Sequence, residues 1–155
     1  MKPQVSALHF RYASGKIANF DTVTAMRVHI LVLNGVFDLG LASLTDTLST
    51  ANQLAGLLED MPAPIVVTLV GVRQRVSTAQ GLNVPVVPVS SASAPDVVLV
   101  PALGAKMPEA LASRLELKDV ADAAGALQQW SASGATAGAA CTGTFVLAES
   151  ALLDG

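Results

Sequence analysis

The chain has 155 residues, of which 52% are hydrophobic and 14% charged, with a formal net charge of -3 at pH 7. This composition excludes a disordered polypeptide and predicts one domain with a substantial core. The 9 lysines and arginines form no basic stripe, so we expect no direct binding of DNA or RNA. A single cysteine, Cys141, and two separated histidines, His9 and His29, give neither a disulfide framework nor a metal site, and we expect no cofactor.

Two stretches resemble membrane or targeting segments in part, and their residues argue against both roles. The charge-free stretch between Asp122 and Glu149 is interrupted by glutamines, serines and glycines, which a membrane span avoids. The first 25 residues contain no apolar core of the kind that a secretory signal needs. We therefore expect a cytoplasmic chain with an N-terminal extension at residues 1–25 and an α/β domain at residues 26–155.

Short apolar runs rich in β-branched residues alternate with helical patterns along the domain. Continuous runs of this kind are typical of strands buried on both faces of a parallel sheet. We expect strands at 28–33, 65–70, 96–100 and 135–140. Shorter pieces are expected at 75–78 and 84–87, and prolines restrict the second of these to an edge or excursion strand.

Helical periodicity is clearest after Asp38. The pattern predicts an amphipathic helix whose buried stripe comprises Leu41, Leu44, Leu48, Ala51, Ala55 and Leu58. A second helix is expected over about 115–131 and a third over 145–153. In the second helix, the residues predicted to share one side are Val120, Ala123, Ala124, Leu127 and Trp130.

The alternation of strands and helices predicts an α/β fold, specifically a flavodoxin-like three-layer sandwich with a mostly parallel sheet and right-handed crossovers. In such sheets, ligands bind at the carboxyl ends of the strands. We therefore expect the loops after Leu33, Val100 and Ala140 to converge on one site.

Cys141 lies at the expected junction between the last strand and the last helix. Ala139 and Gly143 flank it, and small residues at these positions let the backbone turn sharply and present a nucleophile. The amino end of the following helix favours a thiolate and can hold an oxyanion, a carboxylate or a phosphate. The alternative is that Cys141 is a small buried hydrophobic residue, and the spacing alone does not decide between the two.

The residues around Cys141 and three further strings, in the same order, resemble one known superfamily. The strings are 139–155, 36–39 continued by Ala42 and 46–52, 76–82, and 95–104. Together they look like the ThiJ/PfpI-type, class I glutamine-amidotransferase-like domains, and most closely like the N-terminal domain of AraC-family (GlxA-like) transcriptional regulators. The resemblance covers about residues 27–155.

This resemblance implies a site and a domain boundary. The implied ligand-binding residues are Asp38, Ala102, Leu103, Gly104, Cys141 and Thr142, with Cys141 at the position of the catalytic cysteine. Family domains continue beyond the helix that follows this cysteine, so the domain is expected to be incomplete at its C-terminus.

Three departures from the catalytic members bear on function. Their acidic residue at the start of the first helix, which hydrogen-bonds the cysteine, is matched here by Gly40. Their two glycines after the strand-ending proline, whose N–H groups complete an oxyanion hole, are matched by Ala102 and Leu103, where amides remain in a narrower pocket. Their histidine follows the helix after the cysteine and has no counterpart within these residues, so no base is identified.

Other polar residues are poor substitutes for the missing acid and base. His29 lies within an apolar run and is expected to be a core histidine with satisfied hydrogen bonds, whereas His9 lies in the N-terminal extension. Asp38 is best explained as a helix N-cap, although facing the pocket is an alternative.

The remaining candidates are expected to have structural or solvated roles. Asp46 lies off the apolar stripe of its helix. Glu149 follows Cys141 by two helical turns, about 12 Å along the axis, which is too far for a general base. Trp130 and Phe145 are expected to be core residues.

The favoured function is a non-catalytic effector-sensing and dimerisation domain of an AraC-type regulator, without the DNA-binding module. Its expected partners are a small-molecule effector and a second copy of the chain. The alternative is a cysteine-dependent enzyme of the hydratase, glyoxalase-like or amidase kind, with Cys141 as nucleophile. A third hypothesis is an interaction or redox-sensing module, which is distinguished by selective oxidation of Cys141.

Overall fold

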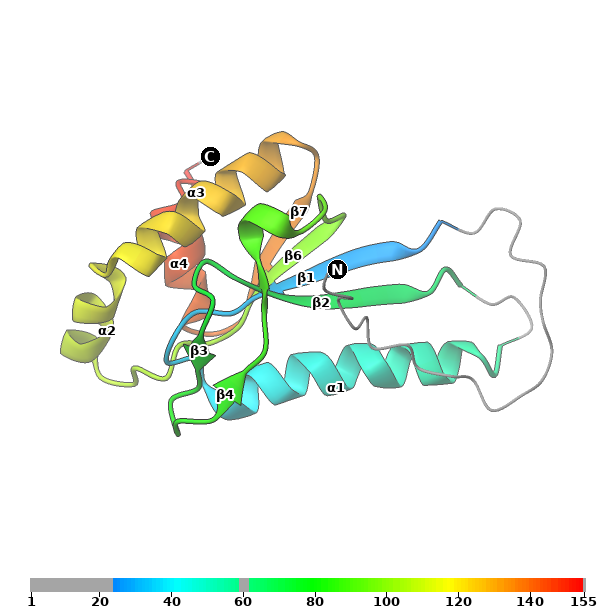
Figure 1. The fold of residues 1–155 in the computed structure, drawn as a ribbon, viewed down its shortest axis with the longest axis horizontal. Helices are drawn as coiled ribbons and strands as arrows, with labels where there is room; N and C mark the ends of the chain where they lie inside the picture. The colour runs from blue at the N-terminus through cyan, green and yellow to red at the C-terminus, as the bar shows by residue number, and fades with distance from the viewer. Residues whose placement is uncertain (1–23, 59–61, 155) are drawn as a thin grey trace, which may run out of the picture.

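A five-stranded parallel sheet forms the centre of the structure, a computed structural model that describes residues 24–58 and 62–154 (Figure 1). Its strands, in the spatial order β5-β2-β1-β6-β7, are β1 (Met26–Leu31), β2 (Ile65–Gly71), β5 (Val87–Pro88), β6 (Val97–Val100) and β7 (Thr136–Ala139). All four neighbouring pairs are parallel. The four long strands predicted from the sequence are confirmed, with ends shifted by one or two residues.

The connection from β2 to β5 contains no crossover helix over residues 72–86, all of which the structure describes. Instead, β3 (Val76–Ser77) and β4 (Asn83–Val84) form a small antiparallel pair outside the main sheet. Gly81, in the turn between them, has a φ of 85°, a conformation that favours glycine. The short 3-10 helix η1 (Val89–Ser91) follows β5. The predicted excursion is therefore present.

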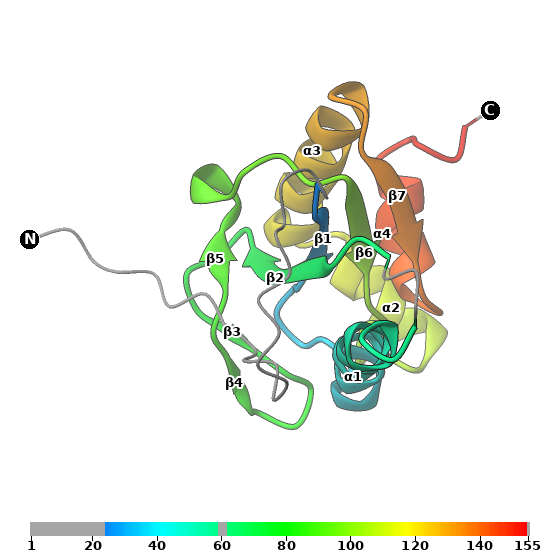
Figure 2. The same cartoon turned by 90° about the vertical axis from the view of Figure 1, so that its right-hand side faces the viewer.

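Helices cover both faces of the sheet and complete three layers (Figure 2). One face is covered by α1 (Asp38–Ala55) and the other by α3 (Lys118–Ala132) and α4 (Gly143–Glu149). The sequence analysis missed α2 (Pro108–Leu115), although a proline at its start and Glu109 in its first turn are recognised helix signals. In the described part of the chain, no helix combines the length and apolarity needed to cross a membrane.

Side-chain alternation along the strands divides the core between the two faces. Leu31 and Val98 point to the α3 side, where they pack with Leu127 and Trp130. Ile30 and its neighbours in the opposite cluster point to the α1 side. All five α3 residues predicted to share one side are buried, which confirms that periodicity.

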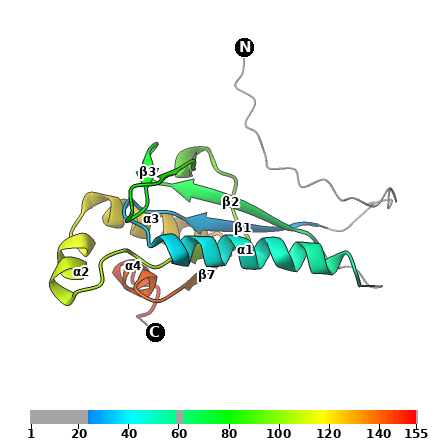
Figure 3. The same ribbon diagram turned by 90° about the horizontal axis from the view of Figure 1, so that it is seen from below.

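The predicted stripe of α1 is correct in its first half and wrong in its second. Leu41 is buried, and Leu44 and Leu48 pack against the core, whereas Leu58 is exposed. The residue that faces the sheet in the second half is Asn52. Its side-chain amide accepts a hydrogen bond from the N–H of Ile65 and donates one to the C=O of the same residue, at 2.9 and 2.7 Å. A pair of side-chain hydrogen bonds therefore replaces apolar packing where α1 meets the start of β2 (Figure 3).

The amino ends of β1 and β6 are joined by Arg27 and Asp96. The N–H and the guanidinium of Arg27 both donate to the carboxylate, at 2.7 and 2.8 Å, and the N–H of Asp96 donates back to the C=O of Arg27. These hydrogen bonds from Arg27 lower the pKa of Asp96 to about 2. The candidate site lies at the opposite end of the sheet, where the carboxyl ends of the strands meet; this end is called the carboxyl edge below.

Candidate functional site

Cys141 sits in a sharp turn, Ala140–Gly143, between β7 and α4. Its φ of 52° lies in the left-handed region, which non-glycine residues rarely adopt. The side chain is exposed and forms no disulfide. The structure therefore disagrees with the buried, purely hydrophobic alternative and places the thiol where an approaching molecule can reach it.

Close packing explains the glycine that follows the cysteine by two positions. A Cβ on Gly143 would lie 2.5 Å from the carbonyl oxygen of Val100 and 2.6 Å from that of Pro101. Both are main-chain atoms at the end of β6, so they cannot move aside as a flexible side chain could. The turn at Cys141 is thus held directly against the loop that follows β6.

Thr142 connects this turn to the same loop through one hydroxyl group. The N–H of Leu103 donates to Thr142 Oγ1 at 2.9 Å, and the hydroxyl donates to the C=O of Leu103 at 3.1 Å. The N–H of Gly104 is also used, because it donates to the C=O of Gly35 at 2.8 Å. Of the two amides that the sequence left available for an oxyanion, at Ala102 and Leu103, that of Leu103 is therefore occupied by an internal hydrogen bond.

Gly40 and Ala102, two of the positions where the sequence departs from the catalytic pattern, face each other. A Cβ on Gly40 would lie 3.3 Å from the Cβ of Ala102 and 3.6 Å from its backbone nitrogen. A side chain at position 40 would therefore compete with the methyl group of Ala102. The departures from the expected pattern at positions 40 and 102 therefore lie side by side.

Asp38 is close to this edge but does not act as the predicted N-cap. The N-cap position of α1 is Phe37, and no side chain caps the helix. Asp38 is the first helical residue, and its Oδ2 accepts a hydrogen bond from the N–H of Gln80 at 3.2 Å. Its Oδ1 is buried and has no hydrogen-bond partner among the described residues. The carboxylate therefore ties α1 to the turn between β3 and β4.

Arg114 also lies near this edge, and its structural role was not predicted from the sequence. Its Nη1 and Nη2 donate to the two carboxylate oxygens of Asp119, both at 2.7 Å, and the side chains of this pair are mostly buried. Nε and Nη2 also donate to the C=O of Asn34, at 3.2 and 2.7 Å. Arg114 thereby fixes the loop after β1. A basic residue is common in the last turn of a helix, so Arg114 could have marked the end of α2. Nothing in the sequence indicates that it would bind the C=O of Asn34.

His29 lies away from the site, in the core beneath α3. Its ring is 2% exposed and meets Trp130 edge-on, with ring centroids 5.4 Å apart. Burial, with a smaller effect from the charge of Arg27, lowers the pKa of His29. The core position was predicted, but satisfied hydrogen bonding was not borne out, because Nδ1 is buried without a partner among the described residues.

The other sequence candidates do not join the site. Asp46 and Glu149 are exposed, and Trp130 is in the core as predicted. Phe145 was expected in the core and is 49% exposed, because Val146 and Leu147 are the α4 residues that turn toward the sheet. His9 lies outside the described residues. Within the described ranges, no cluster of three or more histidine, cysteine or acidic side chains could hold a metal ion.

Comparisons with known proteins agree with this architecture. The structure is similar to a proposed transcriptional regulator from Vibrio parahaemolyticus, with a TM-score of 0.64 and 18% identity over 84% of this chain and 64% of that one. It is also similar to an AraC family transcriptional regulator from Pseudomonas putida, with a TM-score of 0.62 and 20% identity over 83% of this chain and 63% of that one.

A third similar structure is a DJ-1 superfamily protein from Agrobacterium tumefaciens, with a TM-score of 0.57 and 15% identity over 83% of this chain and 60% of that one. The chain spans less than two thirds of the length of each of these three proteins. No protein-family model matches the sequence, and no curated protein matches it significantly. The fold is therefore that of the ThiJ/PfpI and DJ-1 proteins, shared with AraC-type regulators, as the sequence resemblance predicted.

Proposed function

We propose that this chain is the non-catalytic, effector-sensing and dimerisation domain of a cytoplasmic AraC-type transcriptional regulator. In this proposal, a small molecule binds at the carboxyl edge of the sheet, over Cys141 and Thr142, against Asp38 and residues 102–104. Recognition of DNA is assigned to another part of the regulator. The similarity to two regulators supports this function at the level of fold, and the chemistry of the site supports the absence of catalysis.

The observation that carries the proposal is the contact between positions 40 and 102. An acid at position 40 is what sets the protonation state of the cysteine in the catalytic relatives that this sequence resembles. Here position 40 has no side chain, and the Ala102 methyl group stands opposite it. In addition, the N–H groups of Leu103 and Gly104 are already bonded to Thr142 and Gly35. The site thus has an exposed thiol, and two neighbouring amides are engaged within the protein.

Alkylation of Cys141 tests this proposal, because it is the only cysteine in the chain. We would measure the rate with iodoacetamide as a function of pH for the wild type, Gly40→Glu, Ala102→Gly and the double variant. The wild type should react at about the rate of a short unstructured cysteine peptide. Only the double variant, which has both the acid and the space for it, should show a changed pH profile.

The alternative, a cysteine-dependent enzyme, is favoured by one observation, the exposed thiol held in a left-handed turn. It predicts that wild-type Cys141 reacts far faster than the peptide near neutral pH and loses this advantage on unfolding. That result would replace the sensor proposal with the enzyme. A circular dichroism spectrum of each variant establishes that rate differences do not come from lost structure.

Dimerisation is supported by the outer surface of α1. Leu39 and Leu54 are 66% and 57% exposed, and the helix contains only two charged residues, Asp38 and Asp46. Exposed apolar surface poor in charge is typical of protein interfaces. We propose that a second copy of the chain covers this surface.

Light scattering at micromolar concentration tests the assembly. The wild type should be a dimer and Leu54→Glu a monomer. Leu117→Glu is the matched control, since Leu117 is exposed to a similar extent, 51%, outside α1. A monodisperse wild-type monomer, or equal effects of the two substitutions, would contradict the proposed interface.

A further inference from the structure

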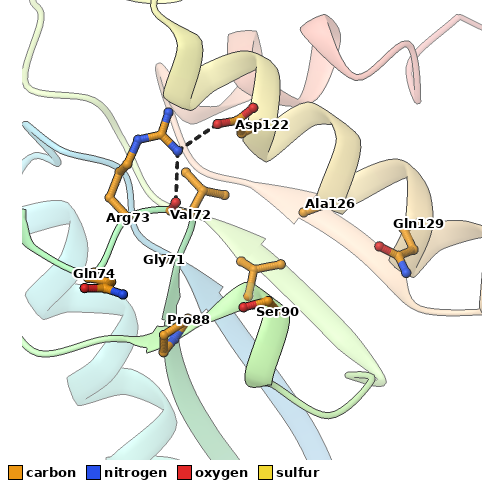
Figure 4. A pocket seen from close by; sticks show the side chains of 10 residues that line it. Gly71, Val72, Arg73, Gln74, Pro88, Ser90, Asp122, Ala126 and Gln129 are labelled. Atoms are coloured by element: carbon orange, nitrogen blue, oxygen red, sulfur yellow. Dashed lines mark hydrogen bonds and ion pairs between the residues drawn. The ribbon is translucent and has the colours of Figure 1, made fainter.

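A cavity of about 500 Å³ also lies at the carboxyl ends of the strands, between the ends of β2 and β5 and the helix α3 (Figure 4). It is lined by residues that follow β2, by the start of η1 and by one side of α3. The sheet order puts it at the β5 edge, whereas Cys141 follows β7 at the opposite edge. It is therefore separate from the candidate site described above. Its size is in the range of pockets that bind small molecules.

The cavity lies beside the connection between β2 and β5. A right-handed crossover helix between these strands would lie on the α1 face, because β5 continues the sheet in the direction from β1 to β2. The β3–β4 excursion takes its place on that face, where Val76 and Val84 pack in the cluster on the α1 side. Gly71 marks the departure point, where a Cβ would lie 2.8 Å from Val86 Cγ2 and 3.1 Å from the C=O of Arg73. The cavity is on the other face, bordered by α3.

Polar and apolar groups line the cavity in about equal measure. Val72, Val89 and Ala126 contribute apolar surface, whereas Gln74, Ser90 and Gln129 bring amide and hydroxyl groups to the rim. Figure 4 shows the three side chains, which come from the segment after β2, from η1 and from α3. A bound molecule could therefore meet both apolar surface and hydrogen-bonding groups here.

The charges at the rim neutralise each other. Arg73 Nη1 donates to Asp122 Oδ2 at 2.7 Å and to the C=O of Val72 at 2.9 Å, which bridges the end of β2 and α3 across the top of the cavity. Arg73 and Asp122 are the charged residues of the lining. Because these two charges are paired with each other, the lining has no net charge to attract an ion and favours an uncharged ligand.

We propose that this cavity is a second binding site, which takes small uncharged molecules that have an apolar body and an amide or hydroxyl group. The apolar body contacts Val72, Val89 and Ala126. The polar group exchanges hydrogen bonds with the side-chain amides of Gln74 and Gln129 or with the hydroxyl of Ser90. This site goes beyond the effector site proposed at Cys141 and does not depend on it.

Three probes of nearly the same shape and different charge test the proposal: benzamide, benzoate and benzylammonium. Each would be titrated to millimolar concentration into the full chain labelled with nitrogen-15, with amide NMR as the readout. Benzamide should shift the signals of residues 71–74, 89–90 and 122–129, and the two ions should shift them far less. Equal responses to all three probes, or benzamide shifts elsewhere only, would overturn the proposal.

A pair of substitutions on one helix provides the control. Ala126 and Ala123 are both buried in α3, but only Ala126 lines the cavity. Ala126→Leu should fill the space, abolish the benzamide shifts and leave the melting temperature unchanged or higher. Ala123→Leu has no cavity to fill and should lower the melting temperature. Benzamide binding that persists in Ala126→Leu, or equal destabilisation by both substitutions, would show that the cavity is not the site.

Discussion

The hydroxyl of Thr142 bonds to both polar backbone groups of Leu103, the N–H at 2.9 Å and the C=O at 3.1 Å. One side chain thus links the turn that holds Cys141 to the loop that follows β6. The hydroxyl also occupies the position that an oxygen of a ligand would take on the Leu103 amide. Under the proposed function, stability and effector binding at this edge depend on the same atom.

Replacing Thr142 by valine separates these two roles. The substitution preserves the shape of the side chain but leaves two backbone groups without partners, at a cost of about 1–2 kcal/mol in the free energy of unfolding. Thr142→Ser keeps the hydroxyl and should lose less than half as much. Urea denaturation followed by circular dichroism measures both. Equal losses in the two variants would mean that the hydrogen bonds contribute little.

Gly143→Ala should be among the most destabilising single-methyl additions in the chain. The new Cβ would approach two carbonyl oxygens at 2.5 and 2.6 Å, and relieving this contact requires the turn to move away from β6. We expect a loss of about 3 kcal/mol in the free energy of unfolding, at the upper end of overpacking effects. Thermal and urea unfolding provide the measurement.

Gly125→Ala is the matched control for that substitution. Gly125 lies within α3, and a Cβ there would have no neighbour within 4 Å. Alanine is the better helix former, so the free energy of unfolding should rise by about 0.5–1 kcal/mol. The free energy of unfolding should therefore fall in Gly143→Ala and rise in Gly125→Ala. A lower free energy of unfolding in Gly125→Ala would contradict the open space described around Gly125.

The Arg114–Asp119 pair should matter far more than the other ion pairs. Arg114→Met leaves the Asp119 carboxylate buried without its partner, and about 3 kcal/mol of the free energy of unfolding should be lost. Arg73→Met breaks an exposed pair and should cost no more than about 1 kcal/mol.

A double variant identifies the origin of the Arg114 effect. Arg114→Met with Asp119→Leu removes both charges and should recover much of the stability lost in the single variant. If the double variant is no more stable than Arg114→Met, the loss arises instead from the missing hydrogen bonds to Asn34.

His29 makes folding sensitive to pH. Because its pKa is lowered in the folded state, the unfolded chain binds the extra proton first as the pH falls below the ordinary value of 6.5. The stabilisation from the neutral ring is therefore fully present above this value and declines as the pH falls toward 5. Urea denaturation at about pH 7.5 and pH 5 should show this decline. His29→Phe, which keeps a ring against Trp130, should reduce it; an unchanged decline would assign the effect to other groups.

The fold was predictable because its strongest determinants are local. Continuous β-branched runs mark the parallel strands, and the periodicity around Val120 and Trp130 correctly gave the buried side of α3. The stripe of α1 failed after Leu48 because a polar residue, Asn52, faces the sheet there. Periodicity registers apolar residues and cannot anticipate a buried side-chain amide bonded to a strand's backbone.

The turn at the candidate site was predictable from residue types, whereas the interactions around it were not. The turn geometry at Cys141 and the need for glycine at position 143 follow from residue size. The pairing of Thr142 with Leu103, the Gln80 contact of Asp38 and the Asn34 contact of Arg114 join residues far apart in the chain. A single sequence contains no signal for such pairings, because each of these residue types has many equally good partners.

The left-handed backbone conformation at Cys141 would suit glycine better than cysteine. An ordinary L-residue pays a steric penalty in this conformation, from which glycine is exempt. Because its side chain is exposed, Cys141 contributes almost no packing that would offset this penalty. Folding alone would tolerate glycine at position 141, so the turn itself does not need the thiol.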